Sequence, residues 1–190
     1  WNKRGVSSET LKPLQGGVAK EGRMKNRFVF PVFNSKDQII GFSGRYIFPI
    51  PENSKTPKWK HMGDKKEWKY PLKVNSKILK KNKKVALVES IGDMLALWEA
   101  GVKNVIVVFG LNVSTAIVNT LISLDPNKII IALNNDSSYN NAGNIAAEKA
   151  MNKLRRYFDY SQLSINLPSH GDFGDMTKDD IKLWAEESNI

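Results

Sequence analysis

After residue 84, short apolar runs alternate with longer stretches that have helical spacing. The apolar runs are Val85 to Val88, Val105 to Phe109, Lys128 to Leu133 and, more weakly, Leu163 to Asn166. Continuous aliphatic runs are typical of strands buried on both faces of a parallel sheet. The helical stretches lie at about residues 91–100, 114–124 and 143–157, and a last one follows Thr177. Four strand-then-helix units predict an α/β fold with a parallel sheet flanked by helices.

The pattern before residue 85 is different. Residues 27–33 and 38–48 are apolar and aromatic around the polar turn 34–37, which predicts a β-hairpin. Residues 1–23 predict a short helix capped by Ser7 or Ser8. Residues 49–84 are rich in Pro, Lys and Trp and predict a basic, flexible link. We therefore expect a small basic α+β subdomain over residues 1–80 and an α/β domain over residues 81–190.

Charge is concentrated in that link. The chain has a net charge of +10, and residues 53–84 alone carry twelve lysines and two acids. This excess predicts a polyanionic partner, although a lysine-rich solvated surface would give the same count. The aromatic residues Trp59, Trp68 and Tyr70 between the lysines offer surfaces on which bases stack; the alternative is that they anchor the link to the core.

Several function classes are excluded or disfavoured by composition. The chain has no cysteine, which excludes disulfides, a Cys-ligated zinc and a thiol nucleophile within this segment. It has no apolar run of the ~18 residues that a membrane span needs and no signal-peptide pattern, so we expect a cytoplasmic protein with no membrane partner. His61 and His170 share no ligand spacing, and no glycine-rich phosphate loop precedes a Lys-Ser/Thr pair.

Acidic and amide side chains follow three of the predicted strands. They are Glu89 with Asp93, Asn134 with Asp136, and Asp172 with Asp175. Because the carboxyl ends of parallel strands meet at one edge of a sheet, these side chains are expected to share a crevice. Carboxylate and amide oxygens are the ligands that Mg2+ or Mn2+ prefers. Each acid taken singly is more often a cap or turn residue, but three strand ends together predict a metal site.

The same segments resemble a known family. Glu89-Ser-Ile-Gly-Asp93, Asn134-Asn-Asp136 and Asp172-Phe-Gly-Asp175 are similar to the EGxxD, DxD and final acidic motifs of the TOPRIM fold. Upstream, Arg4 to Leu11, Asn26 to Pro31, Ile40 to Arg45 and Pro57 to Trp59 are similar to the RGLSxETI, NRIMFPI, GFGGR and PKY segments of DnaG-type primases. The chain therefore resembles the RNA-polymerising core of these primases, over nearly its whole length and in the same order.

The resemblance implies a Rossmann-like TOPRIM domain and template-directed synthesis of a short RNA primer. Ribonucleoside triphosphates would be joined on a single-stranded DNA template, with a replicative helicase as partner in trans or on the same chain. The implied metal ligands are Glu89, Asn134, Asp136, Asp172 and Asp175, with Glu89 and Asp136 as the catalytic pair. Asp93 would orient a ligand or a bound water. Nucleotide or nucleic-acid contacts are implied for Arg27, Arg45, Lys58, Trp59, Lys60 and Lys69.

Three positions depart from the family pattern. Ser90 replaces the glycine after the first acid, Asn134 replaces the first acid of DxD, and residues 137–140 are an insertion. Asn134 offers a carbonyl oxygen but no charge, so it weakens one metal position. This divergence suits a phage origin, in which case the location would be the host cytoplasm. Two other functions stay open at this point: a nuclease-type TOPRIM enzyme, and a non-catalytic module that only binds nucleic acid.

Overall fold

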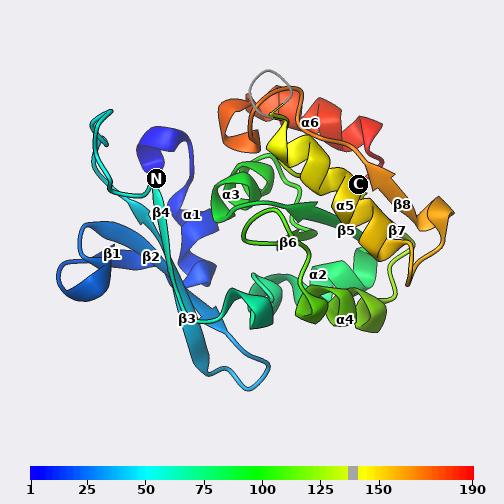
Figure 1. The fold of residues 1–190 in the computed structure, drawn as a ribbon, viewed down its shortest axis with the longest axis horizontal. Coiled ribbons are helices and arrows are strands. Elements are labelled where there is room, and N and C mark those ends of the chain that lie inside the picture. The colour runs from blue at the N-terminus through cyan, green and yellow to red at the C-terminus, as the bar shows by residue number, and fades with distance from the viewer. Residues whose placement is uncertain (137–140) are drawn as a thin grey trace.

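The computed structural model describes residues 1–136 and 141–190 and contains two four-stranded sheets that lie side by side (Figure 1). The insertion at residues 137–140 lies outside the described part of the chain. One sheet is built by the N-terminal third of the chain and is antiparallel, and the other is built after residue 83 and is parallel.

The antiparallel sheet has the strand order β1-β2-β3-β4. Its strands are β1 (Gly17–Ala19), β2 (Arg27–Phe33), β3 (Ile39–Tyr46) and β4 (Trp59–Met62). The predicted hairpin is confirmed: β2 and β3 pair antiparallel, and the Asn34 side-chain oxygen accepts hydrogen bonds from the N–H groups of Lys36 and Gln38 in the turn.

The parallel sheet has the strand order β6-β5-β7-β8, so β5 lies in its interior. Its strands are β5 (Lys84–Val88), β6 (Val105–Val107), β7 (Lys128–Ile131) and β8 (Leu163–Ile165). The four predicted strands are confirmed, with β6 and β7 ending two residues early. The residues beyond each strand end leave the hydrogen-bonded ladder and enter the loops of the candidate site.

The helices follow the predicted pattern, with one addition. They are α1 (Ser8–Leu11), α2 (Leu72–Asn82), α3 (Ile91–Glu99), α4 (Thr115–Leu124), α5 (Ala142–Leu154) and α6 (Lys178–Glu187). A capping box at Thr177 begins α6: the Thr177 hydroxyl accepts from the Asp180 N–H at 3.2 Å, and the Asp180 carboxylate accepts in return from the Thr177 N–H. Among the described residues, no helix has both the length and the apolar character needed to cross a membrane.

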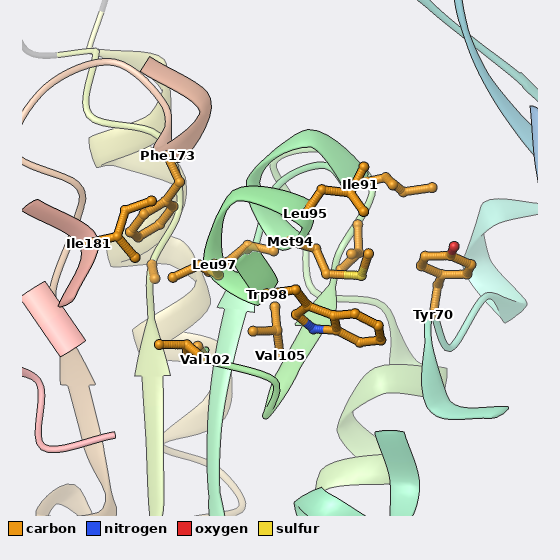
Figure 2. Packing of buried hydrophobic residues seen from close by; sticks show 14 of the residues in the cluster. Tyr70, Ile91, Met94, Leu95, Leu97, Trp98, Val102, Val105, Phe173 and Ile181 are labelled. Atoms are coloured by element: carbon orange, nitrogen blue, oxygen red, sulfur yellow. The ribbon is translucent and has the colours of Figure 1, made fainter. Parts of the chain in front are cut away.

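Helices cover both faces of the parallel sheet. One apolar cluster joins α3 and α6 to β5, and a second joins α4 and α5 to the opposite face. Most of α3 is apolar and buried, as expected of a helix packed between other elements. Figure 2 shows Phe173 and Ile181 on one side of α3 and Tyr70 on the other. Because α3 and α5 leave neighbouring strands toward opposite faces, a crevice forms at the carboxyl ends of β5 and β7.

The prediction of a flexible link over residues 49–84 is wrong from residue 59 onward. Residues 59–62 form β4, which pairs with β3, and residues 72–82 form α2. Trp68 and Tyr70 are 0 % and 5 % exposed, so they anchor this segment to the core and are not free to stack on bases. The proposed boundary at residue 80 stays a prediction; one apolar cluster includes Phe30 of β2 together with Met94 of α3.

Glu99, at the end of α3, connects the N-terminal segment to the parallel-sheet side. Its carboxylate accepts hydrogen bonds from the Ser7 N–H (2.8 Å) and hydroxyl (2.7 Å), and it forms an ion pair with Lys178 of α6 at 3.2 Å. Burial by itself raises the pKa of Glu99, but hydrogen bonds from Thr10, Ser7 and Lys178 outweigh it and lower the pKa to about 2. Ionised Glu99 therefore stabilises the fold.

We expect Glu99→Gln to lower the free energy of unfolding by about 1–2 kcal/mol at pH 7, because the variant loses charge-assisted hydrogen bonds. A carboxyl whose pKa is lowered by folding stabilises the fold above its unfolded pKa and loses that effect as the pH falls. The difference between parent and variant should therefore be constant from pH 7 to about pH 5 and shrink toward pH 2. Urea unfolding at pH 7, 5 and 3 measures it, and a difference that grows on acidification would contradict this assignment.

Candidate active site

The first acidic loop follows β5. Glu89 comes directly after the last residue of that strand, and its side chain is half-buried. Ser90 caps α3, since its hydroxyl accepts hydrogen bonds from the N–H groups of Gly92 (3.0 Å) and Asp93 (3.3 Å). In return, the Asp93 carboxylate accepts from the Ser90 N–H at 2.8 Å. Ser90 therefore fixes the turn that holds Glu89, which is more than the glycine of the family pattern can do.

Asp93 lies beneath this turn and is 1 % exposed. Its Oδ1 atom has no hydrogen-bond partner among the described residues. Burial, followed by the charge of Asp172, raises the pKa of Asp93 to about 7, against the hydrogen bonds from Ser90. The structure thus shows Asp93 as part of the helix cap, and its orientation of a ligand or water stays a prediction.

The second acidic loop follows β7 and is pressed against the start of α5. The Asp136 carboxylate accepts a hydrogen bond from the Gly143 N–H at 3.2 Å, and its own N–H donates to Asn144. A Cβ atom on Gly143 would lie 2.1 Å from the backbone oxygen of Asn134, so only glycine fits there. This close approach fixes the direction of Asp136. Asn134 is half-buried at the end of the strand.

Asn135 joins the second and third acidic loops, and sequence reasoning missed it. Its backbone exchanges two hydrogen bonds with Gly171, at 2.8 and 3.0 Å. Its side-chain amide donates to the backbone oxygens of Pro168 and Ser169 and accepts from Asn144. The local sequence gave no signal for this role, because the residues of the third loop that Asn135 contacts are more than thirty positions away along the chain.

The third acidic loop contains the 3-10 helix Phe173–Asp175. Phe173 is buried and packs edge-on against Trp184 of α6, which holds the loop in place. Asp172 is half-buried and Asp175 is exposed. A Cβ atom on Gly174 would lie 2.8 Å from Asp172 Oδ1 and 3.7 Å from Arg4 Nη2, so this loop also lies against the N-terminal segment.

Glu89 interacts electrostatically with an acid of each of the other two loops. Burial raises the pKa of Glu89, and the charges of Asp136 and then Asp172 raise it further. Glu89 is therefore close enough to Asp136 and to Asp172 for their charges to act on it, and such a cluster favours a bound cation. The sequence predicted Asp175 as a member of the same group. Its side chain is exposed, and its charge acts on Arg45, whose pKa it raises.

The donor set fits a hard divalent cation that also binds substrate. Within residues 1–136 and 141–190, no three His, Asp or Glu side chains form a ready-made metal cluster. Mg2+ is usually held by one or two carboxylates, waters and substrate phosphates, so it needs no all-protein cage. Glu89, Asp136 and Asp172 supply the oxygen atoms and the negative charge for such a site.

A cavity of about 250 Å3 opens beside the acidic loops, between the two sheets. Four cations line it: Arg4, Arg45, Lys58 and Lys178. Asp172 lies on the same wall, so the cavity brings cations and an acidic loop together. Arg4 and Lys178 were not among the predicted contacts, because nothing in their local sequence indicates which surface they face.

Arg45 lies at the centre of this cavity wall. Its guanidinium group is stacked over the rings of Trp1 and Trp59, at 5.6 and 5.7 Å from their centroids. Burial and the charge of Arg4 lower the pKa of Arg45, while Asp172 and Asp175 raise it. Arg45 remains charged at any working pH and is held rigidly by the two indoles.

Arg27 is placed differently from its predicted role. It is 4 % exposed, and its guanidinium group donates hydrogen bonds to the backbone oxygens of Gly44, Pro57 and Lys58. It therefore supports the loop that presents Lys58 to the cavity. A direct contact between Arg27 and nucleic acid stays an untested prediction, and this burial gives it no support.

The remaining predicted contacts are spread over the surface. Trp59 is half-buried and lines the cationic cavity. Lys60 donates a hydrogen bond to the backbone oxygen of Arg23 on the antiparallel sheet. Lys69 is exposed and lies by a separate small hollow next to Tyr70. The structure thus brings Arg45, Lys58 and Trp59 together and leaves Lys60 and Lys69 outside.

Comparison with known proteins connects this geometry to a family. The model of the Toprim domain matches residues 83–163, which contain the first two acidic loops. Residues 83–163 are thus similar to a Toprim domain. The match ends before the third acidic loop, so Asp172 and Asp175 are assigned from the structure of this chain alone.

This chain is also similar to DNA primases. It is 31 % identical over 93 residues to a DNA primase of Staphylococcus aureus (strain COL), covering 48 % of this chain and 15 % of that protein. It is 26 % identical over 113 residues to a DNA primase of Campylobacter jejuni, covering 59 % of this chain and 18 % of that one. The resemblance to DnaG-type primases is thereby confirmed, although the chain spans less than a fifth of these relatives.

Solved structures have the same fold over almost the whole of this chain. A DnaG primase catalytic domain bound to ssDNA has a TM-score of 0.79 and 19 % identity, covering 98 % of this chain and 69 % of that one. The E. coli primase catalytic core has a TM-score of 0.76 and 19 % identity, covering 98 % and 71 %. The predicted fold class, an α/β fold with a TOPRIM-like parallel sheet flanked by helices, is confirmed.

Proposed function

We propose that this chain is the catalytic core of a DNA primase, which joins ribonucleoside triphosphates into a short RNA primer on single-stranded DNA. The observation that carries the proposal is the position of the cation-lined cavity against the third acidic loop, whose Asp172 also acts electrostatically on Glu89. A polyphosphate in the cavity would reach the acidic loops, and phosphoryl transfer needs both kinds of charge around the reacting phosphorus.

The acidic loops would hold one or two divalent cations, Mg2+ or Mn2+. Glu89, Asp136 and Asp172 are the proposed ligands, with Asn134 contributing a neutral oxygen and Asp175 a more distant one. The cation would supply charge neutralisation for the triphosphate and its leaving pyrophosphate. In this proposal Glu89 also accepts the proton of the primer 3′-hydroxyl, since its raised pKa makes it a better base than an exposed carboxylate.

The cavity cations have a separate role. Arg45 and Lys58 bind the triphosphate, with Arg4 and Lys178 on the same wall. The rigid stacking of Arg45 between Trp1 and Trp59 fixes the position of its donors. The positive charge of residues 53–84 then attracts the DNA template without selecting its sequence. A replicative helicase remains an expected partner.

Incubation of the purified chain with single-stranded DNA, labelled ribonucleoside triphosphates and Mg2+ or Mn2+ tests this function. We expect short RNA products that require template and metal. Metal-dependent nicking of supercoiled DNA without RNA products would instead identify a nuclease-type Toprim enzyme. Template binding without either product would identify a non-catalytic binding module.

We expect Arg45→Ala and Lys58→Ala to raise the KM for nucleotides about tenfold, because each removes a charged contact to the triphosphate. The kcat should change less than the KM. Steady-state primer synthesis over a range of nucleotide concentrations measures both constants. Lys149→Ala, which removes an exposed lysine on α5, is the matched control. Unchanged nucleotide kinetics in both cavity variants would contradict the assignment.

A further inference from the structure

A second cavity, of about 200 Å3, lies next to the cationic one. Trp59 and Ser90 line both cavities, so these residues form the partition between them. The second cavity also contacts Ser43, His61 and Glu89. It therefore shares a wall with the first acidic loop, but the cations Arg45 and Lys58 lie on the other side of the partition.

Two polar side-chain atoms at this cavity are buried and unpaired. Ser43 Oγ and His61 Nδ1 have no hydrogen-bond partner among the described residues. Ser43 on β3 is 0 % exposed, and it lies directly opposite His61 on β4 in the antiparallel pair. Opposite residues of an antiparallel pair lie on the same face of the sheet, so both side chains lie toward the cavity. An unpaired buried polar group destabilises the protein, and a ligand that bonds to it would relieve that cost.

The chemistry of these atoms fits a hydroxyl group. Burial, and then the charges of Lys65 and Arg27, lower the pKa of His61 to about 4, so its ring is neutral and can donate or accept. Ser43 can do the same. An anion is disfavoured, because Glu89 lines the cavity and the Lys65 ammonium group already donates to the backbone oxygen of Phe109 at 3.0 Å.

The cavity is also smaller than the pockets that hold whole nucleotide-sized ligands, which measure about 300–1,000 Å3. It therefore accepts one part of a nucleotide. A template-directed polymerase must accept all four bases at one place, so fixed polar groups beside the reacting phosphate have to recognise a part that all nucleotides share. The sugar is that part, and it is joined directly to the α-phosphate.

We propose that this cavity receives the ribose of the incoming nucleotide, and that Ser43 and His61 form hydrogen bonds to a ribose hydroxyl. The inference rests on the proposed function and adds a specificity to it. A deoxynucleotide would leave these buried groups unpaired, and sites built to bond a hydroxyl reject analogues that lack it. Ser43 and His61 thus favour ribonucleotides over deoxynucleotides.

Calorimetric titration of the purified chain with ATP, 2′-deoxy-ATP and 3′-deoxy-ATP, each with Mg2+, tests the proposal without requiring turnover. We expect the parent to bind ATP at least about tenfold more tightly than one of the two deoxy analogues, and that analogue identifies the hydroxyl. Ser43→Ala and His61→Phe should reduce this ratio toward one, while affinity for the analogue is kept. Thr120→Val, which removes a buried hydroxyl on the opposite face of the parallel sheet, should keep the parent ratio.

Thermal unfolding without nucleotide provides the second measurement. Ser43→Ala should leave the melting temperature unchanged or raise it, because it removes an unpaired buried hydroxyl. A lower melting temperature together with an unchanged ATP ratio would show that Ser43 serves the fold, and would overturn the proposal. Equal binding of all three nucleotides by the parent would also overturn it while leaving the primase assignment intact. Failure to bind any of them would overturn both.

Discussion

Glu89→Gln and Asp136→Asn are expected to reduce primer synthesis on the order of a thousandfold or more. Each variant keeps the shape of the side chain and removes one negative charge from the place where the acidic loops converge. The proposed metal site then loses one of its ligands, and Glu89→Gln also removes the proposed base. Binding of single-stranded DNA should stay within about twofold of the parent, because phosphate attraction comes from the lysines and arginines.

Primer synthesis and fluorescence anisotropy with labelled single-stranded DNA measure these two properties. Glu148→Gln removes a carboxylate from the exposed side of α5 and is the matched control, with parent activity expected. Calorimetric titration with Mn2+ gives an independent readout, in which both site variants should bind the ion more weakly. Either variant making primers at the parent rate would refute the assignment of the site.

Trp68→Ala is expected to lower the free energy of unfolding by about 3–5 kcal/mol, as is usual for truncation of a fully buried aromatic residue. Trp68 is 0 % exposed, and its ring packs edge-on against Phe109 at 4.7 Å between centroids. It also fills the space above two glycines: a Cβ on Gly41 would lie 2.4 Å from its ring, and one on Gly63 would lie 3.3 Å from it. No smaller side chain fills this space.

Trp59→Ala is the informative comparison, because both tryptophans come from the same lysine-rich stretch. Trp59 is half-buried at the cavity wall, so its loss should cost about 1 kcal/mol or less in stability. It should instead weaken nucleotide or single-strand binding, since Arg45 loses one of its two stacking partners. Urea unfolding and anisotropy measure the two effects. The opposite pattern, with Trp68 important for binding and Trp59 for stability, would refute this division.

Much of the parallel half of the fold could be predicted from local sequence. A strand buried on both faces must be apolar throughout, and the continuous aliphatic runs of β5, β6 and β7 meet this requirement. The acids also follow from this pattern, because residues that come directly after parallel strands gather at one edge. Glu89 and Asp136 were identified in this way, and the repulsion that raises the pKa of Glu89 agrees with the prediction that they lie close together.

Other features could not be predicted, because they depend on contacts between distant segments. Strand β4 has no alternating pattern of its own and is recognised only through its pairing with β3. Trp68 and Trp59 have similar neighbours in the sequence. Trp68 is an anchor because Gly41 and Phe109 pack against its ring, and the local sequence does not reveal these contacts. Likewise, Asn135 is important only because the loop containing Gly171 folds back onto it.

The sequence by itself determined the α/β class, the parallel strands and the acids that follow them, since each depends on residues that are neighbours along the chain. The tertiary structure decided which cations meet those acids. Arg27 and Arg45 both lie on one hairpin. The Arg27 guanidinium group donates hydrogen bonds to backbone oxygens, whereas the Arg45 guanidinium group stacks on Trp1 at the cavity wall. The packing of the antiparallel sheet against the parallel-sheet half of the chain decides which of the two arginines reaches the cavity. The same packing forms both cavities next to the first acidic loop.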